Sequence, residues 1–331
     1  MDKVLFIGGG SWGSALSFSL AKKGISSTIW HRDKGVVSSM QKSRSHYLIQ
    51  NLNFPDNVFF SNNLSDSIQN AEIIILAIPS QCIREIISAN KNYFTKNKIL
   101  VNVSKGIENN SLMTVSDIII DELGRTCNKI VTLSGPSHAE EVIKLNPTTL
   151  VSSSKDLISA KKVQSVFSSA FLRIYLNKDI LGVELGGAIK NVIAIASGIC
   201  DGIGYGDNTK AALLTRGISE IANLGTLMGA KPSTFQGLSG IGDLIVTALS
   251  KHSRNRLVGQ QIGKGKSLNL ILKKMNMVAE GVKSSISVNE LRKKYNADMP
   301  ICESVYNILF NKKDPKKAVY ELMNRELKIE N

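Results

Sequence analysis

A lysine and an asparagine, Lys190 and Asn191, interrupt an apolar run with helical character at residues 186–196. Burying an ammonium is costly unless it is paired or its pKa falls until the amine is largely neutral. A lysine in such a place can act as an acid or a base. Gly186 and Gly187 lie one helical turn away and leave room for another molecule beside the ammonium. The alternative is that the glycines serve close helix packing and that Lys190 extends to solvent.

A glycine-rich turn near the start of the chain is a second candidate for chemistry. Residues 4–7 are an apolar run typical of a buried strand, residues 8–13 read Gly-Gly-Gly-Ser-Trp-Gly, and a helical pattern follows. In such a unit the first glycine, Gly8, permits a tight turn. The second, Gly10, lets the backbone approach a pyrophosphate, and the third, Gly13, lets the helix pack on the strand. The unit predicts a dinucleotide site with phosphate at the helix N-terminus.

The choice between NAD and NADP depends on two residues that follow a predicted strand at residues 27–30. Asp33 could accept hydrogen bonds from a ribose 2'-hydroxyl, as NAD requires, whereas Arg32 could pair with the 2'-phosphate of NADP. We favour NADP because Arg32 comes first after the strand. The alternative is that Arg32 is a solvated surface residue.

Further buried strands are predicted at residues 72–78, 98–103 and 129–133. Strands that alternate with helical segments indicate a parallel, doubly wound sheet, in which the carboxyl ends converge on the ligand crevice. Lys105 and Gly135 follow two of these ends, so topology places Lys105 near the reactive ring of a cofactor. Gly135 would lie in a turn that shapes the pocket. The alternative for Lys105 is a lysine in a surface loop.

The second half of the chain has a different pattern. After a predicted strand at residues 173–176, long segments with helical periodicity extend from residue 182 to the C-terminus. A chain of 331 residues is also long enough for two domains. We therefore predict an α/β protein with a Rossmann-like, doubly wound N-terminal domain (residues 1–181) and an all-helical C-terminal domain (residues 182–331).

Two polar groups in the helical half could complete a site. Asp243 and Thr247 share one helix face, although Asp243 could instead cap its helix. Residues 251–256 read Lys-His-Ser-Arg-Asn-Arg, a set of donors that could surround an anion. Because this segment has no aromatic residue to stack on a base, a small phosphorylated ligand is favoured over nucleic acid.

Composition narrows the class of protein. The net charge is +14, but the lysines and arginines are spread along the chain, which favours a solvated surface that attracts anionic substrates over a nucleic-acid-binding surface. The four cysteines form no C-x-x-C pair, so no metal site and a reduced, cytoplasmic location are expected. No apolar run is long enough to predict membrane insertion.

These motifs, in this order, resemble the bacterial-type NAD(P)-dependent sn-glycerol-3-phosphate dehydrogenase family, and the similarity covers nearly the whole chain. The matching segments are residues 8–13, 103–106, 134–137, 186–194, 240–244 and 253–256. The resemblance implies a cofactor site at Gly8, Gly10, Ser11, Trp12, Gly13, Arg32, Lys105, Ala139, Arg254, Val278 and Glu280. It implies a substrate site at Lys105, Gly135, Ser137, Lys190, Asp243, Ser253, Arg254 and Asn255. The family often has threonine at the position of Ser137, and a hydroxyl remains.

The resemblance also implies a reaction. NAD or NADP, with NADPH preferred, would exchange hydride with dihydroxyacetone phosphate, giving sn-glycerol 3-phosphate for glycerophospholipid synthesis. The expected catalytic group is Lys190, Lys105, Asp243, Asn191 and Thr247, with Lys190 as proton donor and acceptor. A homodimer is expected from the resemblance alone. The rival hypotheses are a dehydrogenase of hydroxy acids or sugar acids, a nicotinamide-sensing protein without catalysis, and a nucleic-acid-binding protein.

Overall fold

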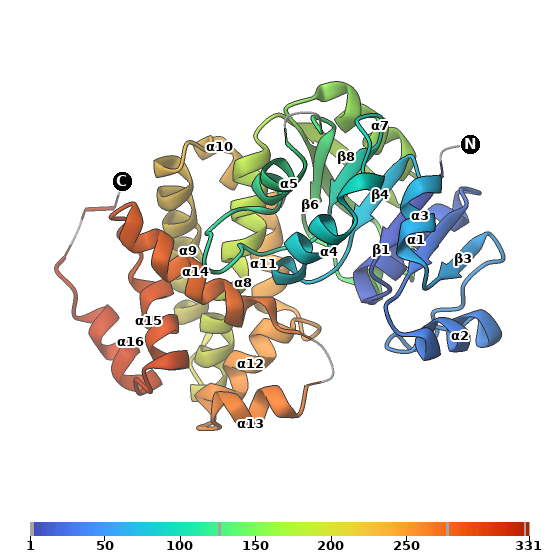
Figure 1. Cartoon of the computed structure of the whole chain (residues 1–331). Helices are drawn as coiled ribbons and strands as arrows, with labels where there is room; N and C mark the ends of the chain where they lie inside the picture. Colours follow the sequence, from blue (N-terminus) through green and yellow to red (C-terminus); the bar gives the residue numbers. More distant parts are fainter. Residues whose placement is uncertain (1–2, 125–126, 276–277, 328, 331) are drawn as a thin grey trace.

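The fold is built on one eight-stranded sheet with the order β3-β2-β1-β4-β5-β6-β7-β8 (Figure 1). The computed structural model describes residues 3–124, 127–275, 278–327 and 329–330. The strands are β1 (Val4–Ile7), β2 (Ser27–Trp30), β3 (Val58–Ser61), β4 (Ile73–Leu76), β5 (Ile99–Asn102), β6 (Ile130–Ser134), β7 (Thr148–Ser153) and β8 (Leu172–Asn177). The first six run parallel to one another. The predicted α/β class with a Rossmann-like sheet is confirmed.

The sheet differs from the prediction at both edges. β3 and β7 are not among the predicted strands: β3 is a short edge strand that exposes Phe59, and β7 contains two apolar residues, Leu150 and Val151, among four hydroxyl residues. β7 also pairs antiparallel with β6, and β8 pairs parallel with β7. The predicted parallel sheet therefore contains one antiparallel pair, β6–β7.

Helices cover both faces of the sheet because successive strand side chains point to opposite sides. In β1, Val4 and Phe6 belong to one core, and Leu5 and Ile7 belong to the other. This double burial explains the uninterrupted apolar runs in the sequence. The helices of this half are α1 (Ser11–Lys22), α2 (Lys34–Ser43), α3 (Leu64–Asn70), α4 (Ile83–Ala89), α5 (Val115–Leu123), α6 (Ala139–Val142) and α7 (Leu157–Phe167), with 3₁₀ turns η1 (Ser80–Cys82) and η2 (Lys91–Tyr93).

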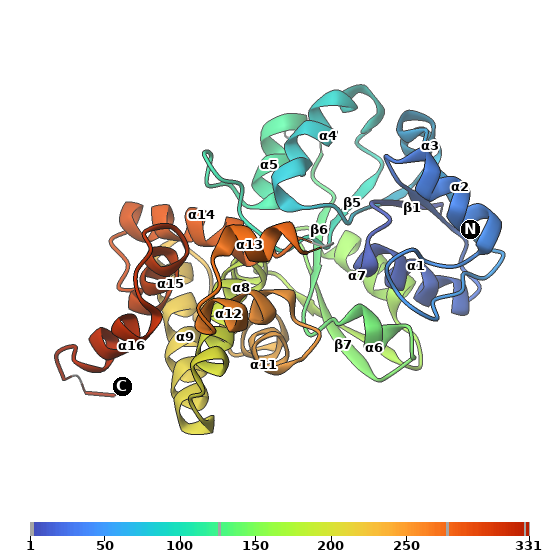
Figure 2. The ribbon, with the colours of Figure 1, turned by 90° about the horizontal axis from the view of Figure 1, so that it is seen from below.

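The rest of the described chain is helical and gathers around the long helix α8 (Ile180–Ile203) (Figure 2). Its other elements are α9 (Asp207–Leu227), α10 (Pro232–Phe235), the π-helical turn η3 (Leu238–Gly242), α11 (Asp243–Leu249), α12 (Arg254–Gly263), α13 (Leu268–Lys273), α14 (Glu280–Lys294), α15 (Pro300–Phe310) and α16 (Pro315–Met323). α8 packs against β6, and η3 packs against β7. The helical half therefore meets the sheet beside the carboxyl end of β6.

α8 is a core helix. By length and hydropathy it could cross a bilayer, but 94% of its most apolar window is buried inside the protein. It packs closely on α12 through glycines on both helices: a Cβ added at Gly198 would lie 1.9 Å from the carbonyl oxygen of Arg256, and one at Gly259 would lie 2.0 Å from that of Ile195. This packing explains why the helix is apolar on all sides.

Candidate active site

The glycine turn after β1 has the features that a pyrophosphate requires. Gly8 has a φ of +118°, and a Cβ there would lie 2.4 Å from the carbonyl oxygen of Ala77. A Cβ at Gly13 would lie 2.6 Å from the oxygen of Gly8, so helix α1 packs directly on the turn. Gly10 is different because a Cβ there meets open space, and no side chain caps the helix that starts after it. The open backbone at an uncapped helix N-terminus fits a dinucleotide phosphate.

Asp33 and Arg32, which follow β2, have different surroundings. Asp33 caps helix α2, since its Oδ1 accepts hydrogen bonds from the backbone N–H groups of Gly35 (2.7 Å) and Val36 (3.2 Å). Arg32 is exposed at the end of the strand. Asp33 therefore already has backbone partners, and Arg32 is an exposed residue directly before it.

His46 supports the glycine turn from the segment after α2, and no sequence motif indicated this role. Its Nδ1 accepts backbone N–H groups from Leu48 and Ile49, both at 3.0 Å. The ring proton must then be on Nε2, which lies 3.1 Å from the carbonyl oxygen of Gly9 and donates to it. Burial lowers the pKa of His46, which favours this neutral form.

Lys105 lies beyond the end of β5 and contacts two other segments of the chain. Its Nζ donates to the Gly135 carbonyl oxygen (3.0 Å), to Ser137 Oγ (2.9 Å) and to Asp243 Oδ2 (2.7 Å). Gly135 has a φ of +136° that favours glycine, and this turn aims its carbonyl at the lysine. The structure thus brings together two strand ends and helix α11.

Lys190 reaches the same carboxylate from α8 and is 4% exposed, so it does not extend to solvent. Its Nζ lies 2.5 Å from Asp243 Oδ1 and 2.5 Å from Thr247 Oγ1. Burial lowers the pKa of Lys190 to about 7; the carboxylate of Asp243 opposes this effect, and the ammonium of Lys105 adds to it. A lysine with this pKa can give or take a proton near neutral pH.

Asp243 holds two lysines rather than capping its own helix. It is fully buried, and α11 begins after Gly242 with no side-chain capping bond.

The two glycines beside Lys190 have different surroundings. A Cβ at Gly186 would lie 2.6 Å from the Ser239 carbonyl oxygen, so this glycine serves close packing. A Cβ at Gly187 would lie 3.1 Å from Ser134 Oγ and 3.5 Å from Lys105 Cγ, so this glycine faces the end of β6 and the lysine side chain.

Asn191 links three helices behind the lysines. Its Oδ1 accepts from Asn255 Nδ2 (2.9 Å), and Asn255 Oδ1 accepts from the backbone N–H of Gly281 (3.0 Å). Its own Nδ2 lies 3.5 Å from the carbonyl oxygen of Lys105. The pair of asparagines therefore fixes α12 and α14 relative to α8.

The basic segment at residues 251–256 does not form one ring of donors. Ser253 caps α12 through the N–H of Arg256 (3.2 Å), and the Arg256 guanidinium turns away to Asp201 (2.6 Å). Arg254 is exposed at the start of α12 and interacts electrostatically with Glu280. Of the two arginines in this segment, Arg254 is therefore the one whose charge acts on Glu280 at the start of α14.

The other predicted cofactor residues occupy varied positions. Trp12 is half-buried on α1, and its Nε1 has no hydrogen-bond partner among the described residues. Ala139 packs in the core at the start of α6, and Val278 is half-exposed before α14. Glu280 Oε2 accepts a hydrogen bond from Ser80 Oγ (3.1 Å), which joins α14 to the sheet half.

Glu184, on α8, is a functional candidate that sequence reasoning missed. This buried carboxylate accepts hydrogen bonds from Asn102 Nδ2 (2.9 Å), Thr132 Oγ1 (2.9 Å) and Ser116 Oγ (2.6 Å). Asn102 in turn accepts the N–H of Ser104, the residue before Lys105. Burial raises the pKa of Glu184, and these donors oppose the rise. A glutamate in an apolar stretch, six residues before Lys190, was the available signal.

A glycine turn of the dinucleotide-binding type at the end of β1, together with two lysines that share the carboxylate of Asp243, defines a nicotinamide-dependent dehydrogenase. Comparison with known proteins then gives the particular family. The chain belongs to the NAD-dependent glycerol-3-phosphate dehydrogenase family: the N-terminal family profile matches residues 3–160, and the C-terminal profile matches residues 179–320. It is an oxidoreductase that uses NAD or NADP.

Individual relatives agree over the full length. The chain is 49% identical to the glycerol-3-phosphate dehydrogenase [NAD(P)+] of Clostridium botulinum (strain Alaska E43 / Type E3), over 100% of this chain and 99% of the relative. It is 46% identical to that of Chlorobium phaeobacteroides, over 99% of each chain. The crystal structure of glycerol-3-phosphate dehydrogenase from Coxiella burnetii matches with a TM-score of 0.94 at 32% identity, covering 98% of this chain and 99% of that one.

Proposed function

We propose that Lys190 is the proton donor and acceptor in the interconversion of dihydroxyacetone phosphate and sn-glycerol 3-phosphate. The observation that carries the proposal is the buried cluster in which Lys190 and Lys105 share the carboxylate of Asp243. When bound, the nicotinamide supplies hydride to C2 of the substrate or accepts it from C2. Negative charge then develops on the carbonyl oxygen, where Lys190 delivers a proton.

The remaining catalytic and substrate residues act around Lys190. Asp243 and Thr247 hold its Nζ, and Lys105 places a second positive charge beside the reacting oxygen. Asn191 fixes the helix behind them. The substrate phosphate and hydroxyls would be held by Gly135, Ser137, Ser253, Arg254 and Asn255. Binding energy at the phosphate, remote from C2, helps to fix the reactive geometry.

We also propose how the dinucleotide is held. The turn of Gly8, Gly10 and Gly13 with Ser11 and Trp12 would bind the pyrophosphate region, and Arg32 the adenosine ribose. Lys105, Ala139, Arg254, Val278 and Glu280 would complete the site. The capping bonds of Asp33 support a preference for NADPH, since they occupy one of its carboxylate oxygens.

Substrate and cofactor preference can be tested together. Purified protein is mixed with dihydroxyacetone phosphate and either NADH or NADPH, and the loss of reduced-nicotinamide absorbance is followed. We expect turnover with both cofactors and a lower KM for NADPH. Hydroxy acids and sugar acids are compared with sn-glycerol 3-phosphate in the oxidative direction, with NAD+ or NADP+ as hydride acceptor; faster turnover of one of them would contradict the proposed substrate.

The substitution Arg32→Ala should weaken NADPH binding selectively. A charge-assisted contact to the 2'-phosphate is worth about 1.5–3 kcal/mol, so the Kd for NADPH should rise roughly 10- to 100-fold. The Kd for NADH should change little, and both are measured by fluorescence titration. Arg173→Ala, which removes another exposed arginine, is the control for net charge. An equal loss for both cofactors would contradict the assignment.

The pH dependence should follow the Lys190 pKa of about 7. Reduction of the ketone needs the protonated amine, so its kcat/KM should fall as the pH rises through about 7. Oxidation of the alcohol needs the neutral amine, so its rate should rise over the same interval. The residual activity of Lys190→Met should not change with pH in this interval. If the pH dependence persists in that variant, another group, such as the substrate phosphate, is responsible.

The proposal also covers the two domains, the oligomeric state and the location of the protein. We propose that residues 1–181 form the cofactor domain and residues 182–331 the substrate domain, which the end of β8 at Asn177 and the start of α8 at Ile180 support. The family resemblance supports a cytoplasmic homodimer, without membrane insertion or nucleic-acid binding, that supplies glycerophospholipid synthesis. Light scattering of the purified protein tests the dimer.

A further inference from the structure

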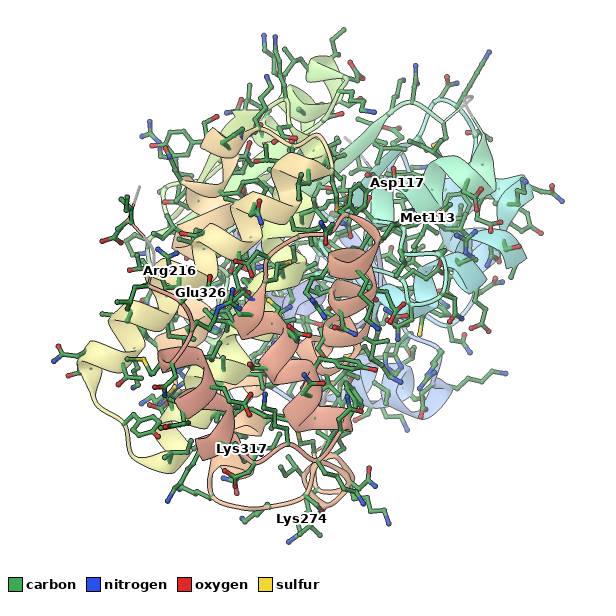
Figure 3. The ribbon with its side chains drawn as sticks, turned by 90° about the vertical axis from the view of Figure 1, so that its left-hand side faces the viewer. Met113, Asp117, Arg216, Lys274, Lys317 and Glu326 are labelled. Carbon is green, nitrogen blue, oxygen red and sulfur yellow. The ribbon has the colours of Figure 1, made fainter. Side chains whose placement is uncertain are left out.

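The segment that carries Lys105, residues 105–113, lies at the boundary between the sheet half and the helical half. We call it the Lys105 loop. Met113 at its end and Asp117 beyond it lie at this boundary (Figure 3). Just before the loop, the N–H of Ser104 donates to Asn102 Oδ1 (2.8 Å) and its hydroxyl donates to the Ile78 carbonyl oxygen (2.6 Å). The chain that enters the loop is therefore fixed to the sheet.

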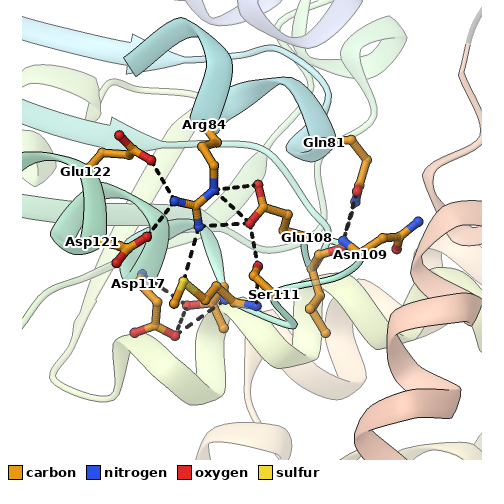
Figure 4. A network of polar contacts seen from close by, with 11 residues as sticks. Gln81, Arg84, Glu108, Asn109, Ser111, Asp117, Asp121 and Glu122 are labelled. Atoms are coloured by element: carbon orange, nitrogen blue, oxygen red, sulfur yellow. Dashed lines mark hydrogen bonds and ion pairs between the residues drawn. The ribbon is translucent and has the colours of Figure 1, made fainter. Parts of the chain in front are cut away.

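Arg84 on α4 fixes the other side of the loop (Figure 4). Its Nε and Nη2 bind the Glu108 carboxylate at 2.9–3.1 Å. Its Nη1 binds Asp121 (2.5 Å) and Glu122 (2.6 Å) on α5. One guanidinium thus ties the loop to two helices through a forked pairing, a geometry that lysine cannot reproduce.

Neighbouring side chains hold the backbone between Lys105 and Glu108. Gln81 Nε2 donates to the Ile107 carbonyl oxygen (2.7 Å), and Gln81 Oε1 accepts the N–H of Asn109 (2.9 Å). From α14, the Ser287 hydroxyl donates to the same Ile107 oxygen (3.0 Å). The loop is therefore held from both halves of the molecule within two to four residues of Lys105.

The loop contains backbone strain that this network must hold. Asn110 has a φ of +48° and Leu112 a φ of +60°. The left-handed region is unfavourable for a residue such as leucine and persists when surrounding contacts enforce it. Loss of the Arg84 contacts would therefore let the loop relax towards another conformation.

We propose that Arg84 is a positioning residue for Lys105, acting through Glu108 and the strained Lys105 loop. The proposal rests on the role assigned to Lys105 above. Arg84 does not reach the reacting atoms; it fixes where the Lys105 ammonium meets Asp243. A displacement of about 1 Å at such a site can lower the rate about 100-fold.

A double-mutant cycle tests this coupling. Arg84→Gln, Lys105→Ala and the double variant are compared by kcat/KM for dihydroxyacetone phosphate at saturating cofactor. Arg84→Gln alone should lower kcat/KM roughly 10- to 100-fold. In the Lys105→Ala background the same change should have less than about a twofold effect, because coupled residues are non-additive. Losses that multiply independently would overturn the proposal.

Three further measurements separate the possible failures. Arg292→Gln removes a half-buried arginine that pairs with Glu303 away from the crevice, and should leave kcat/KM unchanged. Glu108→Gln cuts the same link from the loop side, so it should reproduce the coupling to Lys105 even if Arg84→Gln does not fold. If Lys105→Ala alone leaves kcat/KM unchanged, the proposed role of Lys105 is wrong. If Lys105→Ala lowers kcat/KM strongly, but Arg84→Gln and Glu108→Gln lower it by the same factor with and without Lys105, the positioning role of Arg84 is wrong.

Discussion

Lys190→Met is expected to lower kcat on the order of 10³-fold in both directions, with the Kd for the cofactor retained. Methionine has a similar length but carries no proton, so the charge that develops on the substrate oxygen would lose its acid. Steady-state kinetics and cofactor titration measure the two effects. Asp243 keeps its pairing with Lys105, so the melting temperature should fall less than it does in Asp243→Asn.

A second buried lysine provides the control. Lys98 is 8% exposed, and its Nζ donates to the carbonyl oxygens of Ile68, Gln69 and Ala71 near the end of α3. Lys98→Met should lower stability by leaving these carbonyls without their donor, while kcat stays near normal. Near-normal turnover of Lys190→Met would contradict the proposed acid, and a loss of cofactor binding would indicate a structural role instead.

Asp243→Asn should have the second-largest effect, on both activity and stability. Removing one partner of a buried ion pair typically costs about 3–5 kcal/mol, and here two ammonium groups lose the same carboxylate. The carboxylate raises the pKa of Lys190, so its loss should move that pKa further below 7. The falling limb of ketone reduction should therefore shift to lower pH.

The structure offers a matched control for this variant. Asp201 is also shared by two cations, Lys210 and Arg256, but it lies near the far end of α8. Asp201→Asn should lower the free energy of unfolding without changing kcat or the pH profile. If Asp243→Asn keeps the wild-type turnover and pH profile, Asp243 does not act on Lys190 in the reaction.

Local features of the fold were predictable from the sequence because short-range rules govern them. The strand at residues 4–7, the tight turn at Gly8 and the change to helical periodicity after β8 are features of this kind. β3 and β7 were not predicted, since pairing at the sheet edges stabilises segments whose own pattern is weak.

The sequence by itself determined the α/β class, the glycine turn and the presence of a lysine within an apolar helix. The tertiary structure alone decided which groups share partners. Lys105 and Lys190, 85 residues apart in number, meet on Asp243, whereas Arg256 turns to Asp201 and Asp33 caps its helix. Spacing along a chain specifies helix faces and turns, but the partner of a charged side chain depends on which elements pack together.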